Sequence, residues 1–456
     1  KTRNLHDLAE KAGVTAATAS MALRNSPRLS EAVKERIRRI AEKDGFTPRS
    51  YNRKQENAPG KRFSQDIKVT DLLYECFHKL EMDGNFDSSF EKIRERFTAI
   101  ADELRIDMDM EACLDEVRDG MYKYGSTEYF ASRGEYLSGR IMAAFLGFAF
   151  VDAAEVIAFT SGGEFDAATT RAKLKKKLAG VKYAVIPGFY GADDSGLIHT
   201  FSRGGSDITG ALIAEAVNAE LYENWTDVNG FLTADPRIVD HPSGIRELSY
   251  RELRELAYMG ANVLHPESIF PVRAGGIPIN IRNTFEPENK GTMIVPEITD
   301  SRRGNTITGI AGKKGYSIIY IEKSMMNSEI GFARKVLSVL EYYNIGFEHM
   351  PSGIDTLSIV VADSEIAGRQ EVVLDKIQKT VNPDHVEIKD GISLIATVGH
   401  GMSFKPGTAA KLCGALATAG VNIRMIDQGS SEMNIIVGVA TQDYEKAVRA
   451  IYKAFE

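Results

Sequence analysis

The sequence has few cysteines, a single tryptophan and no long apolar run. The three cysteines, Cys76, Cys113 and Cys413, are far apart and fit no disulfide or metal-binding pattern, so no residue set is assigned to a metal. No apolar stretch approaches the ~20 residues that cross a bilayer, and no signal-like start is visible, so we expect a cytoplasmic protein with no membrane partner. The apolar content of 43% and charged content of 26% are typical of a globular chain, and 456 residues suggest three or four domains.

An excess of positive charge is confined to the start of the chain. Residues 1–54 contain 13 Lys and Arg against 6 Asp and Glu, whereas the whole chain contains 56 and 63. The first segment therefore has a net charge of about +7 and the remainder of about −14. A basic arm on an acidic body predicts two different partners.

The first 54 residues have the pattern of three short helices. Apolar spacing predicts a first helix that ends before Gly13. Thr15 can cap a second helix over about 16–23, and Ser30 can cap a third. Two short helices joined by a glycine turn form a helix-turn-helix, whose second helix is suited to a DNA major groove.

This segment resembles the DNA-binding headpiece of the LacI family. The similarity rests on three phrases, Ala9–Ser20, Asn25–Ser30 and Gly45–Pro48. It implies binding of double-stranded DNA by residues of the second helix and its flanks, namely Thr15, Ala16, Ala17, Thr18, Ser20, Met21 and Asn25. The three base-facing side chains among them are apolar and cannot form hydrogen bonds to a base edge. The family's hinge helix with its leucine and its sugar-binding domain do not follow here, and residues 55–60 form a polar linker or graft seam.

Residues 61–300 alternate between helix-like and strand-like patterns. Helices are predicted at about 66–81, 87–105, 109–124, 126–148, 166–178, 208–221 and 249–260. Strands are predicted at 155–159, 183–187 and 277–281. This alternation predicts an α/β three-layer domain with a mostly parallel sheet.

A series of glycine-rich and polar phrases follows the predicted strands and helices. In chain order they are Gly134-Glu135, Gly188-Phe189 with Gly191, Arg203-Gly204-Gly205-Ser206-Asp207, Thr226-Asp227-Val228 through Asp235-Pro236-Arg237, and Gly260 through Pro266. Their order resembles aspartate kinase, of the amino-acid kinase fold. The resemblance implies transfer of a phosphoryl group from Mg-ATP to the side-chain carboxylate of L-aspartate.

The resemblance also assigns roles to matching positions. Substrate-binding residues would be Thr70, Glu135, Arg203 and Ser206. Arg203 would hold a substrate carboxylate through its planar fork of donors. Nucleotide-binding residues would be Thr226, Asp227, Phe231 and Arg237.

Two departures from the family pattern bear on activity. Asn262 stands where the family often has a lysine. The family's opening Lys-Phe-Gly-Gly-Ser segment, which holds the transferred phosphates, occurs nowhere in the sequence, and the first strands that accompany it are missing. Losing these donors removes electrostatic stabilisation of the transition state, so we expect kinase activity to be lost or strongly impaired and no complete catalytic set.

Residues 301–456 contain a repeated α+β pattern. Two predicted strands within 307–321, separated by a turn at residues 312–315, and predicted strands at 356–362, 393–398 and 434–439 alternate with predicted helices at 330–343, 408–419 and 444–455. The repeat resembles the tandem ACT domains of aspartate kinases, which dimerise and bind an amino-acid effector. The resemblance implies a homodimer, and an effector such as lysine held by Asn327, Ser328, Gly331, Phe332 and Asp355. A purely structural dimerisation repeat is the alternative.

Three interpretations of the whole chain remain open. The first is a regulated aspartate kinase with an added DNA-binding arm. The second is an amino-acid sensor whose ACT dimer pairs two headpieces on DNA. The third is a chimera, in which repressor sequence replaces the N-terminus of a kinase. Two abrupt breaks in family pattern that meet at one polar seam favour the chimera.

Overall fold

The computed structural model describes residues 11–12, 39, 67–202, 204–261, 263–264, 269–298 and 306–456. The chain divides into two units, Lys1–Lys68 and Val69–Glu456. The predicted helix-turn-helix, its DNA-binding residues and the predicted linker lie outside the described residues. Within the described part, no helix is long and apolar enough to cross a membrane.

The second unit begins with a layer of four helices. They are α4 (Val69–Asp83), α5 (Asp87–Glu103), α6 (Met110–Tyr124) and α7 (Thr127–Leu146). Their positions confirm the first four predicted helices. Two of these helices begin at capping residues that can be recognised in the sequence. The Asp109 side chain accepts a hydrogen bond from the backbone N of Ala112, and Ser126 caps α7 in the same way.

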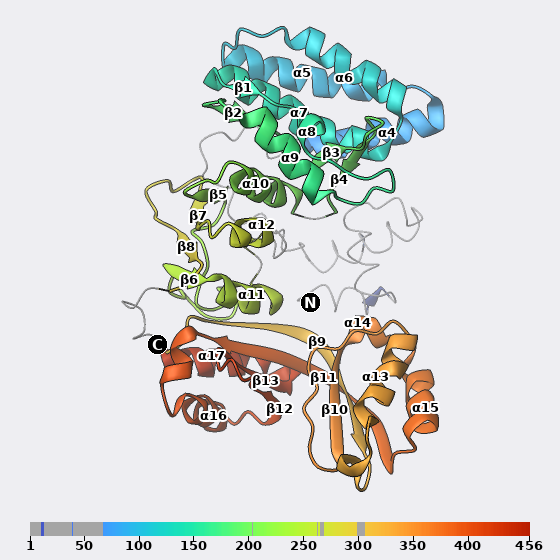
Figure 1. The fold of residues 1–456 in the computed structure, drawn as a ribbon, viewed down its shortest axis with the longest axis vertical. Coiled ribbons are helices and arrows are strands. Elements are labelled where there is room, and N and C mark those ends of the chain that lie inside the picture. The colour runs from blue at the N-terminus through green and yellow to red at the C-terminus, as the bar shows by residue number, and fades with distance from the viewer. Residues whose placement is uncertain are drawn as a thin grey trace. The chain divides into compact units, whose positions relative to one another are not determined.

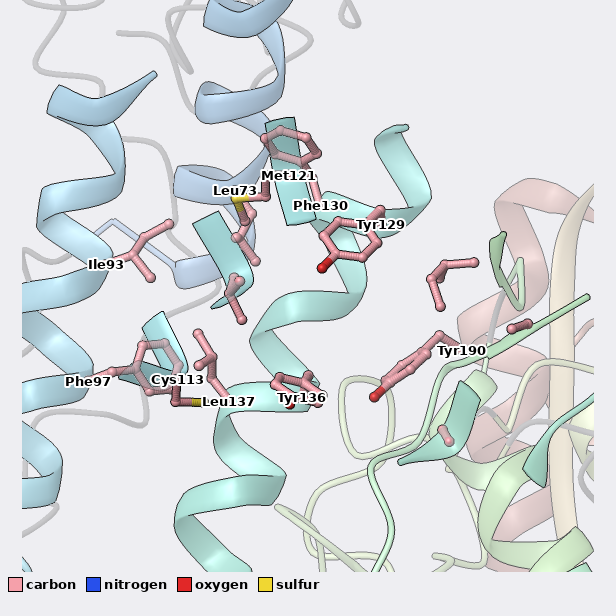
Figure 2. Packing of buried hydrophobic residues seen from close by; sticks show 14 of the residues in the cluster. Leu73, Ile93, Phe97, Cys113, Met121, Tyr129, Phe130, Tyr136, Leu137 and Tyr190 are labelled. Carbon is pink, nitrogen blue, oxygen red and sulfur yellow. The ribbon is translucent and has the colours of Figure 1, made fainter. Parts of the chain in front are cut away.

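The core of this helical layer is aromatic and aliphatic. Phe86, Phe90, Phe130 and Leu114 are each no more than 1% exposed. Figure 2 shows Tyr136 on α7 next to Tyr190, and both side chains belong to this cluster. Burial of each large apolar side chain stabilises the fold by about 1.5–3 kcal/mol.

Short strands and helices follow the helical layer. The helices are α8 (Ala153–Val156), α9 (Ala167–Leu178), α10 (Gly205–Ala216), α11 (Tyr250–Tyr258) and α12 (Ile269–Ala274). The strands are β1 (Ala149–Phe150), β2 (Ala184–Val185), β3 (Tyr190–Ala192), β4 (Ile198–Thr200), β5 (Tyr222–Thr226), β6 (Glu247–Ser249), β7 (Ile279–Asn283) and β8 (Thr292–Val295). Strand β1 pairs parallel with β2, β3 and β4 form an antiparallel pair, and a four-stranded sheet has the order β5-β7-β8-β6.

One predicted strand in this region is wrong. Residues 155–159 were expected to be extended, but Glu155 and Val156 belong to helix α8. The Asp152 side chain accepts a hydrogen bond from the backbone N of Ala154, which starts a helical turn in the middle of an apolar run. Of the predicted strand, Ala158 and Phe159 form only isolated bridges.

The last part of the chain contains one five-stranded antiparallel sheet with helices. Its strands are β9 (Gly309–Glu322), β10 (Thr356–Ala362), β11 (His385–Val398), β12 (Ile423–Asp427) and β13 (Asn434–Ala440), in the order β10-β9-β11-β13-β12. Its helices are α13 (Phe332–Tyr342), α14 (Asp363–Ile366), α15 (Gln370–Val381), α16 (Thr408–Thr418) and α17 (Tyr444–Phe455), with short 3-10 turns η3 (Met326–Ser328), η4 (His400–Phe404) and η5 (Thr441–Asp443).

The repeat is present, but its two halves are interleaved and not strictly consecutive. Strand β9 was predicted as two strands and is one long strand, drawn beside β11 in Figure 1. Its residues 316–322 pair with β10 and with residues 385–392 of β11, whereas its residues 309–314 pair with residues 393–398. The pairing shifts register next to Gly315, whose φ of 94° suits glycine. Each long strand therefore serves both halves of the repeat.

A buried carboxylate ties α11 to this sheet. Glu252 is fully buried and completes a capping box at the start of α11 with Ser249. Its Oε1 accepts hydrogen bonds from Thr308 Oγ1 at 2.6 Å and from the backbone N of His400 at 3.0 Å. One side chain thus joins a kinase-region helix to two segments of the ACT region.

Candidate functional site

The candidate site is built around the turn that leads into α10. Gly188 and Phe189 follow β2, and a side chain on Gly188 would place its Cβ only 2.8 Å from Ser206 Cα. In the same way, a Cβ on Gly205 would lie 2.8 Å from Phe189 Cα. The two glycine phrases are therefore in direct backbone contact, and glycine is required at both positions for that approach.

Helix α10 begins in a conformation suited to anion binding. Its N-cap residue, Gly204, has a φ of 58°, and no side chain caps the helix. Backbone N–H groups point out of the first turn of a helix, and together with the helix dipole they favour a negative charge at this end. Ser206 is exposed in that first turn. Arg203, which the sequence places next to it, lies outside the described residues.

Strand β5 is fixed against the start of α10. The Asn224 side chain donates a hydrogen bond from Nδ2 to Asp207 Oδ1 at 2.9 Å. Tyr222 donates from its hydroxyl to the backbone carbonyl of Asp207 at 3.3 Å. Sequence reasoning missed Asn224, although the polar or aromatic residues at 222, 224 and 226 alternate as one face of a strand does.

Helix α7 brings Glu135 toward the same region. A Cβ on Gly139 would lie 3.3 Å from Pro187 Cβ, so α7 passes close to the residue before Gly188. Glu135 lies one helical turn before Gly139 on the same face of α7. Its side chain is exposed, yet the surrounding protein displaces enough water to raise the pKa of its carboxyl group.

Thr70 is exposed in the first turn of α4. A Cβ on Gly134 would lie 3.6 Å from Val69 Cγ1 and 3.4 Å from Leu73 Cδ1, so this turn packs on α7 beside Glu135. Of the predicted substrate-binding residues, Glu135 and Ser206 therefore lie on elements that meet just after β2, and Thr70 lies on a helix that packs on α7.

The predicted nucleotide-binding residues have different surroundings. Thr226 ends β5, and Asp227 follows it with an exposed side chain. Phe231 is 1% exposed, and its backbone N donates to Thr292 Oγ1 at 2.8 Å, so its side chain is part of the core. Arg237 forms a two-point ion pair with Asp235, with Nη2 to Oδ2 at 2.6 Å, and this guanidinium lowers the pKa of the Asp235 carboxyl group.

The predicted effector residues gather at the end of β9. Asp355 Oδ1 accepts a hydrogen bond from the backbone N of Met325 at 2.8 Å, which joins the start of β10 to the loop after β9. Asn327 and Ser328 are exposed in the 3-10 turn η3. Gly331 is the N-cap of α13.

Phe332 differs from the other predicted effector residues because it is buried. Its side chain is 4% exposed, with the Lys323 ammonium 5.5 Å from the centre of its ring. Lys323 also pairs with Glu329, and together with Lys335 it lowers the pKa of the Glu329 carboxyl group. The Phe332 side chain is therefore part of the core that underlies the loop after β9. The other four predicted effector residues are on the surface of that loop or next to it.

Three family models match successive parts of the chain. Residues 61–283 match the amino acid kinase family, residues 395–455 match an ACT domain, and residues 4–49 match the bacterial regulatory proteins of the lacI family. The α/β fold and the turn at α10 thus define an amino acid kinase domain followed by ACT domains.

Individual relatives give a narrower result. Aspartokinase 3 of Bacillus subtilis is 36% identical over 420 residues, which cover 88% of this chain and 91% of the relative. The crystal structure of Clostridium acetobutylicum aspartate kinase is 52% identical, with a TM-score of 0.77, and the match covers 88% of this chain and 92% of that one. The chain belongs to the aspartokinase family.

Two structures of E. coli aspartokinase III have the same fold. The complex with aspartate and ADP in the R-state is 25% identical, with a TM-score of 0.63, and covers 86% of this chain and 92% of that one. The complex with lysine and aspartate in the T-state is 24% identical, also with a TM-score of 0.63, and covers 86% of this chain and 91% of that one.

The described residues fit a bound Mg-ATP only in part. The end of β5 offers the hydroxyl of Thr226 and the exposed carboxylate of Asp227, which suit a nucleotide and its hard cation. The start of α10 offers backbone N–H groups to an anion. Arg237 is engaged by Asp235, and the Lys-Phe-Gly-Gly-Ser segment of the family is absent from the sequence.

Proposed function

We propose that residues 61–300 form an aspartate kinase catalytic domain that binds L-aspartate but transfers phosphate poorly or not at all. The observation that carries this proposal is the close backbone contact between Gly188-Phe189 and the start of α10. It supports a carboxylate site of backbone N–H groups beside Ser206, with Arg203 as its cationic partner. The ATP phosphates would lack the lysine and glycine turn that the family uses.

In such a site the chain's own residues perform positioning and charge compensation. The α10 N-terminus and Ser206 would hold one carboxylate of aspartate. Glu135, with its raised pKa, would face the substrate amino group from α7. Mg-ATP would supply the phosphoryl group and neutralise developing charge when bound. Without the missing donors, the rate of phosphoryl transfer would fall by a factor of about 10²–10³ for each donor lost.

The test separates binding from turnover. Calorimetric titration of the full chain with L-aspartate is expected to show binding, which Ser206→Ala and Glu135→Gln weaken about 10-fold or more. Glu220→Gln, an exposed carboxylate in the same region, is the matched control and is expected to bind like the wild type. A coupled ADP-release assay is expected to show little turnover. Turnover equal to that of the Bacillus relative would overturn the second half of the proposal.

We also infer that the chain is a join between a LacI-type headpiece, residues 1–54, and a kinase that lacks its own N-terminus. The lacI match ends at residue 49 and the amino acid kinase match begins at residue 61, which supports a seam at 55–60. A natural amino-acid-responsive DNA-binding protein is the second candidate function. Its test is a gel-shift titration at several salt concentrations, with and without lysine; a change in DNA affinity caused by lysine would favour it.

Lysine is the proposed effector of the ACT region, and a homodimer the proposed assembly. The support is the cluster of Asn327, Ser328 and Asp355 beside α13, together with the lysine complex of E. coli aspartokinase III. A thermal-shift screen with lysine, threonine and methionine tests the effector, and light scattering tests the dimer. No shift with any of the three would support a purely structural repeat.

A further inference from the structure

One buried hydroxyl joins the two glycine phrases of the candidate site. Thr209, one turn into α10, is 1% exposed. Its Oγ1 donates a hydrogen bond to the backbone carbonyl of Gly205 at 2.7 Å and accepts one from the backbone N of Phe189 at 3.3 Å. A hydroxyl has a single proton, so donation to Gly205 leaves its lone pairs for the Phe189 N–H group. Thr209 is therefore a donor and an acceptor at once.

Phe189 has a backbone conformation that needs such support. Its φ of 81° lies in the left-handed region, which bulky residues rarely adopt. Residues with strained backbones persist only where the surrounding contacts fix them. The Phe189 carbonyl accepts a hydrogen bond from the backbone N of Phe201 at 2.9 Å, and the Phe189 N–H group donates to Thr209. Phe189 is thus fixed from two segments, the one that follows β4 and helix α10.

The conformation of Phe189 sets how closely the turn approaches α10. A Cβ on Gly188 would lie 2.8 Å from Ser206 Cα and 3.2 Å from Ser206 Oγ. Backbone therefore packs directly on the first turn of the helix, next to the Ser206 hydroxyl. A rotation about φ at Phe189 displaces the residues before it relative to those after it. Such a rotation would move Gly188 away from Ser206.

The first turn of α10 is also held by strand β5, through a different residue. Asp207 accepts hydrogen bonds from the Asn224 side chain at its Oδ1 and from the Tyr222 hydroxyl at its backbone carbonyl. These two bonds join β5 to the helix. The β5 contacts therefore fix the helix, and the Thr209 contact fixes the turn that packs on it.

We propose that Thr209 is a positioning residue of the candidate site, which holds the Gly188-Phe189 turn against the first turn of α10. Because its side chain is buried, it acts through the Phe189 backbone on the distance between Gly188 and Ser206. Its importance for aspartate binding rests on the proposed function. The hydroxyl makes both hydrogen bonds, so serine can replace threonine here, whereas valine, which has the same shape but no hydroxyl, cannot.

Two measurements on the full chain test this role. Calorimetric titration with L-aspartate is expected to show about 10-fold weaker binding by Thr209→Val, and binding within about twofold of the wild type by Thr209→Ser. Hydrogen exchange of the ligand-free chain is expected to show several-fold lower protection of the Phe189 amide in Thr209→Val and wild-type protection in Thr209→Ser. Thr209→Ala, which also lacks the hydroxyl, is the second variant and is expected to change both readouts in the same direction as valine.

Thr292→Val is the matched control for a general loss of stability. Thr292, on β8, is fully buried, and its hydroxyl also makes two bonds of the same kinds. It donates to the backbone carbonyl of Ile245 and accepts from the backbone N of Phe231. Thr292→Val is expected to lower the melting temperature about as much as Thr209→Val does. Its aspartate binding and its protection of the Phe189 amide are expected to equal those of the wild type.

Three results would overturn the positioning role. One is wild-type protection of the Phe189 amide in both variants that lack the hydroxyl. Another is equal weakening of aspartate binding by Thr209→Val and Thr292→Val, which would indicate a general loss of stability. The third is Thr209→Ser that is folded by circular dichroism but binds aspartate as weakly as Thr209→Val. A wild type that shows no aspartate binding would refute the proposed function instead, and the exchange data would still decide whether Thr209 fixes the turn.

Discussion

The kinase region and the ACT region of the second unit differ in how completely their sheets are built. The ACT region has one sheet of five strands, two of which are 14 residues long. The kinase region has strands of two to five residues in three separate sheets among the described residues. Strands of that length leave few backbone hydrogen bonds to hold a layer together. Among the described residues, the ACT region therefore has one continuous sheet, whereas the kinase region has three small ones.

Burial shows the same contrast. Ile319, Ile395 and Val437, in the central strands of the ACT sheet, are completely buried. Trp225 in β5 is 44% exposed and Tyr183, next to β2, is 53% exposed. Parallel sheets are normally covered on both faces, so exposed aromatic residues beside short parallel strands indicate a layer that is only partly covered.

The largest effect on the difference between the two regions is expected from adding the family's N-terminal segment to the kinase region. Replacing residues 1–57 with the N-terminal segment of the Clostridium acetobutylicum relative tests this, because the family resemblance implies a Lys-Phe-Gly-Gly-Ser segment there. We expect turnover in the ADP-release assay to rise by about 10³-fold or more. A variant of this replacement with its new lysine changed to alanine is the control. Equal turnover before and after replacement would show that the missing segment is not what limits activity.

A substitution in the core of the ACT region measures how much the packing of its five-stranded sheet contributes to the free energy of unfolding. Ile359→Ala removes a fully buried side chain from β10 and is expected to lower the free energy of unfolding by about 2–5 kcal/mol. Ile354→Ala, at a position that is 71% exposed, is expected to change it by less than about 0.5 kcal/mol. Denaturant titration followed by circular dichroism checks both. Similar losses for the two variants would contradict the burial argument.

The link between the two regions depends on Glu252. Glu252→Gln keeps the shape of the side chain but replaces one carboxylate oxygen with an NH2 group. This group cannot accept the hydrogen bonds that the oxygen accepts in the wild type. We expect a loss of about 1–3 kcal/mol and two separate unfolding transitions in calorimetry. Glu341→Gln, on the exposed face of α13, should leave the single profile unchanged. A single unshifted transition in Glu252→Gln would show that the regions are joined by other contacts.

The smallest expected effect is a pH dependence in the kinase region. Hydrogen bonds from the Ser195 hydroxyl and from the backbone N–H groups of Ser195 and Leu197 help to lower the pKa of Asp193 to about 2 in the folded chain, so they contribute stability above the unfolded pKa. That contribution is lost as pH falls from about 4 through about 2. Asp193→Asn is therefore expected to be less stable than the wild type at pH 7, and the difference should shrink at low pH. Urea titrations at pH 7 and pH 3 measure it, and a difference that grows on acidification would contradict the assignment.

The sequence predicted the helices far better than the strands. Amphipathic spacing and local caps such as Asp109 and Ser126 are visible in short windows, so the predicted helices from α4 to α7 are confirmed. Strands β3, β4, β6 and β8 contain three or four residues, too few for an alternation to be recognised. The error at 155–159 has a local cause as well, since Asp152 starts a helical turn where apolar residues suggested a strand.

Parts of the candidate site could be predicted only because their motifs occur along the chain in the same order as in aspartate kinases. The phrases around Gly188 and Gly205 were recognised, and their backbone contact explains why both need glycine. Asn224 was missed because its contact with Asp207 depends on the packing of β5 against α10. The role of Phe231 remains a prediction, although its burial leaves only its backbone available to a ligand.

The interleaved ACT strands also constrain the order in which the chain can fold as it is synthesised. Residues 309–314 of β9 leave the ribosome early, but their partners, residues 393–398 of β11, emerge only after the whole intervening half. The intervening half, residues 316–392, can fold first as a unit, because its strands pair with one another. Residues 309–314 therefore stay unpaired until residues 393–398 have emerged. A nascent chain that stalls near residue 391 would therefore have its first ACT half folded and residues 309–314 unpaired. An unpaired sheet edge of this kind is a target for chaperones.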